Sequence, residues 1–273
     1  MSTPRIYPVA AVGKDGRIYV FGGKTRPGGT GTPIHTSSVE IFDPATNAWS
    51  SGTPIPGPGR IRAAAVTAAD GRIFLFHRTS RLVLVYNPAR SAWTTGPSVP
   101  SGTYVYGAVA GPGALLSVVT AKGSSLWLYS LDPVTGRWRS RGATSGVPIA
   151  LGADGLLYGA TGSRAWAIDP ATGQTSPRNA TPEFADFVSV AAGPGGLIWA
   201  VGAAYLHPSG VRWAEWSRPV VEAYDPATDS WLLAPRPAVL RWWHAVAGSG
   251  DRLYVIGGST GTYTAAVEVF VAD

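Results

Sequence analysis

The sequence predicts an all-β fold made of repeated four-stranded units, and three observations support this prediction. Its 35 glycines, 23 prolines, 11 tryptophans and 11 tyrosines are typical of short strands joined by tight turns rather than of long helices. A hydrophobic content of 45% in 273 residues is ample for a sizeable core. Two short patterns also recur along the whole chain, about once every 45 residues.

The first pattern is a strand that ends in Asp-Pro and is followed by tryptophan. Asp accepts hydrogen bonds from the amides after it and Pro fixes φ, so the pair closes a tight turn between two strands. The tryptophan is a large apolar plate that can pack one sheet on the next. The copies are "VEIFDPATNAW" (39–49), "VLVYNPARSAW" (83–93), "YSLDPVTGRW" (129–138), "AWAIDPATGQT" (165–175), "VEAYDPATDSW" (221–231) and the partial copy "VEVFVAD" (267–273).

The second pattern lies upstream of the first and is an Asp-Gly turn, an apolar strand and a Gly-Gly pair. Gly-Gly permits positive φ and a close backbone approach. Each unit therefore reads as strand a, an Asp-Gly turn, strand b, strand c, an Asp-Pro turn and strand d. The copies are "DGRIYVFGG" (15–23), "DGRIFLFHR" (70–78), "DGLLYGATG" (154–162), "GGLIWAVGA" (195–203) and "DRLYVIGGS" (251–259).

These paired patterns resemble the kelch-repeat family over essentially the whole chain. The resemblance implies a single six-bladed β-propeller, with strand a at the axis and strand d outermost. The expected blades are 1–57, 58–99, 100–143, 144–181, 182–238 and 239–273, and the last blade has three full strands. The repeat departs from its pattern at His77-Arg78 and Val119-Thr120, where Gly-Gly is expected, and at Thr175, where Trp is expected.

Antiparallel strands send the d-to-a and b-to-c connections to one face, which we call the upper face. The longest departure from the repeat is the b-to-c loop 203–219 of blade 5, and insertions on one face of a repeat array mark the binding face. The residues that the repeat does not explain lie in the upper connections of blade 5 or at its junction with blade 6. They are the acids Glu183, Asp186 and Glu215 and the tryptophans Trp213, Trp216, Trp242 and Trp243.

The upper mouth of the central channel is therefore the predicted binding site. By repeat register this face holds twelve basic residues against those three acids, and a focused positive potential favours an anionic ligand. Arginine suits carboxylate or phosphate, and indole suits the apolar side of a ring. We expect His244 to be mainly structural. The predicted ligand-binding residues are Arg5, Tyr7, Arg60, Arg62, Tyr104, Tyr106, Trp213, Trp216, Arg241, Trp242, Trp243 and His244.

Two classes of function stay open. The first is a binding propeller that recognises an anionic or aromatic small molecule, or an acidic peptide. The second is an enzyme that resembles kelch isomerases such as sialic acid mutarotase, with Asp186 or Glu183 as general acid or base and Glu215 or His207 as its partner. A cyclase with a tryptophan-lined pocket is a variant of the second class.

Other chemistries and partners are disfavoured by the composition. The chain has no cysteine, which the copper-radical oxidases of this fold require, and its four histidines fall on three blades without metal spacing, so we expect neither metal nor cofactor. Nucleic acid is a poor fit to a ring-shaped mouth. No signal peptide or membrane span is visible, so the chain is expected to be soluble and cytoplasmic as written, with a secreted origin left open. We expect either that two copies associate through the open edge of blade 6 or that the chain once continued there.

Overall fold

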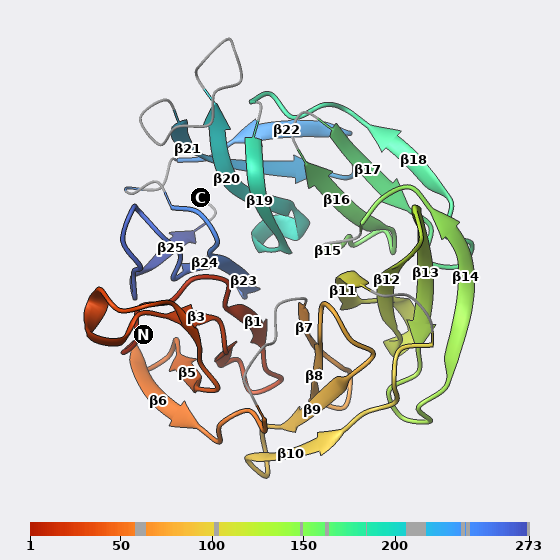
Figure 1. Ribbon diagram of the computed structural model, residues 1–273. Helices are drawn as coiled ribbons and strands as arrows, with labels where there is room; N and C mark the ends of the chain where they lie inside the picture. The colour runs from red at the N-terminus through yellow and green to blue at the C-terminus, as the bar shows by residue number, and fades with distance from the viewer. Residues whose placement is uncertain are drawn as a thin grey trace.

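The computed structural model describes residues 1–57, 64–100, 104–147, 150–161, 164–183, 185–205, 217–235, 238 and 241–271. Six antiparallel sheets surround a central axis, as Figure 1 shows, and their innermost strands ring the channel. Five sheets have four strands and the last has three. The predicted six-bladed propeller with a three-stranded final blade is thus confirmed.

The strands are grouped here by their place in the blade. Strands a are β1 (Val9–Val12), β7 (Ala64–Thr67), β11 (Tyr104–Ala110), β15 (Ala150–Leu151), β19 (Ala185–Ala192) and β23 (Ala245–Ser249). Strands b are β2 (Ile18–Phe21), β8 (Ile73–Phe76), β12 (Leu116–Lys122), β16 (Leu157–Thr161), β20 (Ile198–Tyr205) and β24 (Arg252–Ile256). Strands c are β5 (Val39–Asp43), β9 (Val83–Asn87), β13 (Ser125–Leu131), β17 (Arg164–Ile168), β21 (Ser217–Asp225) and β25 (Val267–Val271). Strands d are β6 (Ala48–Gly52), β10 (Ala92–Thr95), β14 (Trp138–Thr144), β18 (Thr175–Arg178) and β22 (Ser230–Leu233).

Smaller elements occupy the connections. The b-to-c loop of blade 1 carries a short hairpin of β3 (Lys24–Thr25) and β4 (Ile34–His35). Three 3-10 turns, η1 (Pro27–Gly29), η2 (Pro112–Ala114) and η3 (Pro194–Gly196), complete the described elements. Among these described segments, no helix has the length and apolar character that crossing a bilayer requires.

The core lies between the blades, because both faces of strand b are covered. All four residues of β2 and of β8 are buried. The Asp-Pro turns have the geometry that the sequence suggests: the Asp43 carboxylate accepts the Ala45 amide at 3.0 Å, and the Asp225 carboxylate accepts the Ala227 amide at 2.9 Å. Hydrophobic burial thus fixes the blades, and local turn chemistry sets their lower edges.

The outer rim is joined by a repeated hydrogen bond across each of four seams between blades. The indole N–H of a tryptophan in strand d donates to a backbone carbonyl of the preceding blade. In that blade, the acceptor lies four residues after the position that corresponds to the tryptophan. The three indole bonds are Trp93 to Thr53 at 2.9 Å, Trp138 to Pro97 at 3.4 Å and Trp231 to Asn179 at 2.8 Å. At the remaining seam Thr175 replaces the tryptophan, and its hydroxyl meets the Thr144 hydroxyl at 3.0 Å. We call these contacts the outer seam bonds.

Blade 6 presents an open edge. In the part of the chain that the structure describes, β25 pairs with β24 alone. Val269 and Val271 are 45% and 52% exposed. The N-terminal residues lie elsewhere: the Ser2 amide donates to Glu40 at 2.5 Å and the Arg5 amide donates to the Thr264 carbonyl at 3.2 Å. Residues 1 to 4 therefore do not supply a strand along β25.

Candidate functional site

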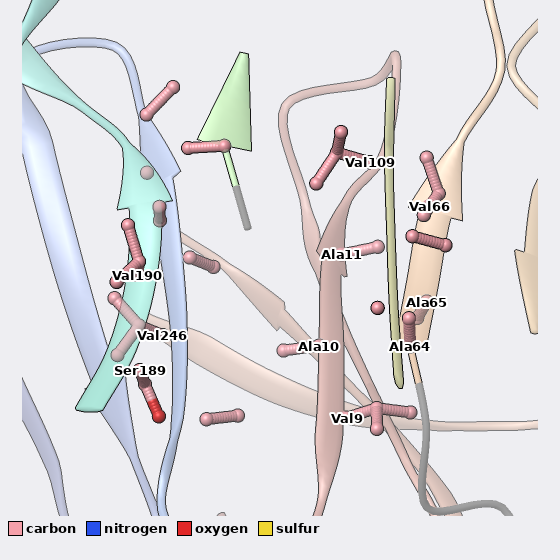
Figure 2. Close-up of a pocket in the computed structure, with 18 of the residues that line it drawn as sticks. Val9, Ala10, Ala11, Ala64, Ala65, Val66, Val109, Ser189, Val190 and Val246 are labelled. Carbon is pink, nitrogen blue, oxygen red and sulfur yellow. The ribbon is translucent and has the colours of Figure 1, made fainter. Parts of the chain in front are cut away.

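The propeller axis holds a cavity of about 630 Å³ whose wall is made by the strands a of all six blades. Figure 2 shows small aliphatic side chains around this space, among them Ala10, Ala65 and Val190, with Ser189 as a polar exception. Alanine and valine at these positions leave room where larger side chains would fill the axis. The channel is therefore an apolar pocket open to a ligand, and its selectivity depends on the residues at its mouth.

Tyr7 and Trp243 form an aromatic pair at the upper mouth. Their ring centroids lie 5.2 Å apart, and both residues line the cavity. Trp243 is 36% exposed, a large accessible area for an indole. The backbone joins the two blades here, because the Tyr7 amide donates to the Trp243 carbonyl at 2.8 Å. Blades 1 and 6 thus place one aromatic platform at the mouth.

The backbone around this pair explains why these side chains reach the channel. Ile6 bridges to Lys24 and Trp242 bridges to Ser259, so the residue before each aromatic is fixed against the end of strand b. The next residue then takes a left-handed conformation, with φ of 53° at Tyr7 and 59° at Trp243. Non-glycine residues rarely adopt this region, and such strain is concentrated at functional sites.

Gly23 and Gly258 make these bridges possible. A Cβ at Gly23 would lie 2.7 Å from the Ile6 carbonyl oxygen, and one at Gly258 would lie 2.7 Å from the Trp242 carbonyl oxygen. Both glycines also have positive φ, of 94° and 99°. The Gly-Gly pairs seen in the sequence therefore allow the close backbone approach that presents Tyr7 and Trp243.

Arg78 and Tyr106 form a second feature of the mouth, contributed by blades 2 and 3. The Arg78 guanidinium carbon lies 5.5 Å from the centroid of the Tyr106 ring, and both side chains line the cavity. The Arg78 carbonyl accepts the Val105 amide at 2.9 Å, which ties the two blades together. Of the lining residues that the structure describes, Arg78 is the one that carries a charge at pH 7. Sequence reasoning noted Arg78 as a departure from Gly-Gly but did not place it in the site.

His244 lies behind the aromatic pair, at the start of β23. Its side chain is buried, and its Nδ1 lies 3.2 Å from the Arg241 carbonyl oxygen. Burial lowers the pKa of His244 to about 4, so the imidazole is neutral at pH 7. This neutral, buried ring supports the wall of the pocket.

Arg5 and Arg241 are held in ion pairs inside their blades. Arg5 is fully buried, and its guanidinium pairs with the Glu40 carboxylate and donates to the Gly22 carbonyl at 3.1 Å. Arg241 pairs with Glu268 at 3.0 Å and is 3% exposed. These guanidiniums clamp the d-to-a connection to strand c, and neither of them lines the cavity.

These pairs change the expected charge balance of the upper face. Three of its twelve basic residues are neutralised locally, because Arg218 also pairs with Glu183, at 2.6 Å. The signal was present in the sequence: Arg5 and Glu40 recur together as Arg241 and Glu268 in the same repeat positions. Arg60 occupies the arginine position in blade 2, where strand c carries Leu84 instead of glutamate.

Blade 5 uses the same strand-c position differently. Glu222 is 1% exposed, and it accepts the backbone N–H of Glu183 at 2.8 Å. Burial raises the pKa of Glu222 to about 7. The Glu183 carboxylate in turn accepts from Arg218. A buried carboxyl with a raised pKa therefore lies beside the d-to-a connection that leads into β19.

The structure describes some of the other predicted residues and not the rest. Tyr104 is exposed, and Tyr7, Tyr106, Trp243 and His244 meet at the cavity. Asp186 lies in β19 with its backbone paired to Ala203, and the structure describes nothing of its side chain. The other predicted residues lie outside the described part of the chain: Arg60, Arg62, His207, Trp213, Glu215 and Trp216.

The radial sheets around an axial channel define the class of this protein, a six-bladed β-propeller. Residues 5–56 match the Kelch motif, which is consistent with a kelch-repeat propeller. No curated protein matches the sequence.

Solved structures show the same fold at low sequence identity. The structure of YjhT is similar with a TM-score of 0.65 and 14% identity, over 100% of this chain and 98% of that one. Virginiamycin B lyase from Staphylococcus aureus is similar with a TM-score of 0.60 and 13% identity, over 100% of this chain and 86% of the lyase. A fungal alcohol oxidase of the AA5 family, in complex with copper, has a TM-score of 0.52 and 18% identity, over 93% of this chain and 58% of the oxidase.

Proposed function

We propose that this propeller binds a small molecule with an apolar or aromatic body and one anionic group at the upper mouth of its channel. The observation that carries the proposal is the contrast within one cavity of about 630 Å³. Its wall is alanine and valine, whereas its mouth has an aromatic pair and one arginine. A ligand pocket of this size with few polar groups recognises the apolar body of its ligand by shape and the anionic group by charge.

The body of the ligand would lie against Trp243 and Tyr7. An aromatic ring or the apolar face of a sugar ring can stack on the exposed indole. The alanines of strands a then accommodate the inner part of the molecule, because their side chains leave the axis open. Apolar contacts supply most of the binding free energy in such a site.

The anionic group would pair with Arg78. Its guanidinium is stacked on Tyr106, which orients the planar fork while leaving its N–H groups for a ligand. A carboxylate matches this fork with two parallel hydrogen bonds. Arg5 and Arg241, which the sequence suggested for this role, already serve Glu40 and Glu268.

An isomerase of acidic sugars would need a group that transfers protons at the channel. His244 is neutral and buried, and Glu183 is paired with Arg218. The described residues therefore favour binding over proton transfer. Asp186 and the inserted loop would have to provide that chemistry.

Calorimetric titration with a matched pair of probes tests the proposal. The probes are 2-naphthoate and the neutral 2-naphthamide, which share a body and differ in charge. We expect the protein to prefer the carboxylate. Arg78→Gln should weaken binding of the carboxylate about tenfold and leave the amide unchanged, because it removes the charged hydrogen bonds alone. Trp243→Ala should weaken both probes.

Arg90→Gln is the control variant. It changes the net charge by the same amount, but Arg90 lies exposed in the Asp-Pro-type turn of blade 2, at the opposite end of the propeller. This variant should bind like the wild type. Equal effects of Arg78→Gln and Arg90→Gln would show that the anion binds elsewhere or responds only to net charge.

A further inference from the structure

The outer rim of the propeller shows a regular pattern that stops at blade 6. Four seams carry outer seam bonds, from blade 2 to blade 1 and onward to the seam between blades 4 and 5. In the described part of the chain, no such bond crosses the two seams that flank blade 6. The strand that would form them is the fourth strand of that blade.

Blades 5 and 1, which flank the outer edge of blade 6, present an acceptor and a donor for such bonds. On the blade 5 side, the pattern assigns the acceptor to the carbonyl of Pro235, four residues past Trp231, and Pro235 is exposed. On the blade 1 side, the pattern assigns the donor to the indole N–H of Trp49. Within the described residues, Trp49 Nε1 has no acceptor. The place of a fourth strand is therefore outlined by one donor, one acceptor and the edge of β25.

The other blades also specify which residues such a strand carries. A tryptophan stands opposite the strand-c residue before the turn: Trp49 opposite Phe42, Trp93 opposite Tyr86 and Trp231 opposite Tyr224. The corresponding residue of blade 6 is Phe270, which is half-buried against blade 5. Stacking distances of 4.9 to 5.1 Å in the three complete pairs show how closely the rings fit.

In blades 1 and 2, a glycine stands three positions after the tryptophan because a valine side chain of strand c leaves no room for a Cβ. Gly52 faces Val39, where an added Cβ would lie 2.9 Å from the valine side chain, and a Cβ at Gly96 would lie 2.9 Å from Val85. Blade 6 has Val267 and Val269 in the same positions as Val83 and Val85. The strand that fits is therefore Trp-x-x-Gly in extended form.

We propose that the edge of β25 binds an extended peptide segment of a partner protein, antiparallel to β25, with the pattern Trp-x-x-Gly. Its tryptophan stacks on Phe270 and donates to the Pro235 carbonyl. The carbonyl four residues later accepts from Trp49. Main-chain hydrogen bonds to β25 supply affinity, and the tryptophan and glycine positions supply selectivity, as in other cases of strand addition to a sheet edge.

A second copy of this chain is a poorer occupant. Its Trp-x-x-Gly segments are already strands of its own blades, so a donor copy would have to break one of them. Two β25 edges paired together would place valines against valines, without a tryptophan opposite Phe270. The complementary groups on blades 5 and 1 would then stay unused.

The test uses the full protein and a synthetic peptide with the sequence of residues 47–56, "NAWSSGTPIP", which contains a strand of the required pattern. Calorimetry should show saturable binding with one peptide per protein. The same peptide with Trp49→Ser should bind at least about tenfold more weakly, since it loses the stacking and the seam bond. Trp49→Phe in the protein should weaken binding several-fold through loss of its N–H.

Variants of Val269 test the edge itself. The Gly96 amide donates to the Val83 carbonyl, so Val83 and every second residue from it face the outer edge, and Val269 occupies such a position in β25. Val269→Pro removes an outward N–H without touching the ladder to β24 and should abolish peptide binding. Val269→Thr keeps that N–H and should bind like the wild type. Thermal melts check that both variants fold.

Two results would overturn the proposal. One is binding that does not distinguish the tryptophan peptide from its serine control. The other is a concentration-dependent dimer, seen by light scattering, that excludes the peptide and disappears with Val269→Pro, which would assign the edge to a second copy.

Discussion

Blades 1 and 5 place a buried glutamate at the same position of strand c and neutralise it in opposite ways. Glu40 meets the buried guanidinium of Arg5, so the pair is charged and internally balanced. Glu222 meets a backbone N–H instead, and its pKa rises to about 7. The repeat therefore fixes where a carboxyl is buried but not whether it carries charge. That is decided by the connection packed above it.

The position of Arg218 strengthens this comparison. In blade 5 the arginine reaches Glu183 on the connection rather than Glu222 on the strand, and it is 34% exposed. The ion pair of blade 5 therefore lies closer to solvent than the Arg5–Glu40 pair of blade 1. The buried carboxyl of Glu222 can still be protonated near pH 7. Blade 5 also carries the insertion, so its upper connection is held differently from those of blades 1 and 6.

The largest expected effect comes from Glu40→Gln. This substitution leaves the guanidinium of Arg5 buried without its counter-charge, and breaking a buried pair costs about 3–5 kcal/mol of unfolding free energy. Urea denaturation at pH 7 measures the loss. Arg17→Gln is the control: Arg17 pairs with Asp43 at 3.3 Å but is 51% exposed, and its loss should cost under about 0.5 kcal/mol. Similar losses in both variants would contradict the idea of a buried clamp.

The same substitution at Glu222 should act in the other direction. A carboxyl whose pKa is raised in the folded state stabilises fully below its unfolded pKa and loses that contribution as pH rises through the folded value. The wild type should therefore become less stable between about pH 4.5 and 7, by about 3 kcal/mol, and level off above. Glu222→Gln should remove this slope and be more stable than the wild type at pH 8. A slope that survives the substitution would mean that another group titrates.

The smallest effect is expected at the partly buried pair of blade 5. Glu183→Gln should lower the unfolding free energy by about 1 kcal/mol, because Arg218 is partly solvated and can rehydrate. Arg218→Gln should cost a similar amount, and the double variant should cost little more than either. Fully additive losses in this cycle would show that the two side chains do not interact.

The fold was predictable because the signals that define it are local. The Asp-Pro turns, the tryptophan that follows them and the Gly-Gly pairs each act within a few residues, so a single sequence shows them repeatedly along the chain. The three-stranded blade 6 followed from the same count. Thr175 was recognised as a departure, but its hydroxyl contact with Thr144 depends on the neighbouring blade and was not foreseen.

The site was harder to predict because its chemistry is decided across blades. Arg5 was assigned to a ligand since its partner Glu40 lies 35 residues away in another element of the blade. Arg78 reaches the channel only because blades 2 and 3 bring it over Tyr106. The alanines of strands a belong to neither repeated motif, whereas their small size on the innermost strand of every blade creates the cavity.

The outer seam bonds have a mechanical consequence. Within the described residues they form an arc over four seams of the ring and are lacking at both seams of blade 6, so the outer rim is open at that blade. Thermal opening should start at this part of the rim. Amide hydrogens of β23 to β25 should then exchange with deuterium sooner than those of β8 or β12, even though all of these strands lie in the same fold. The first motion of the propeller would be a loosening of its last blade at the outer rim, because backbone hydrogen bonds from Tyr7 to Trp243 and from Arg5 to Thr264 hold the inner part of that blade to blade 1.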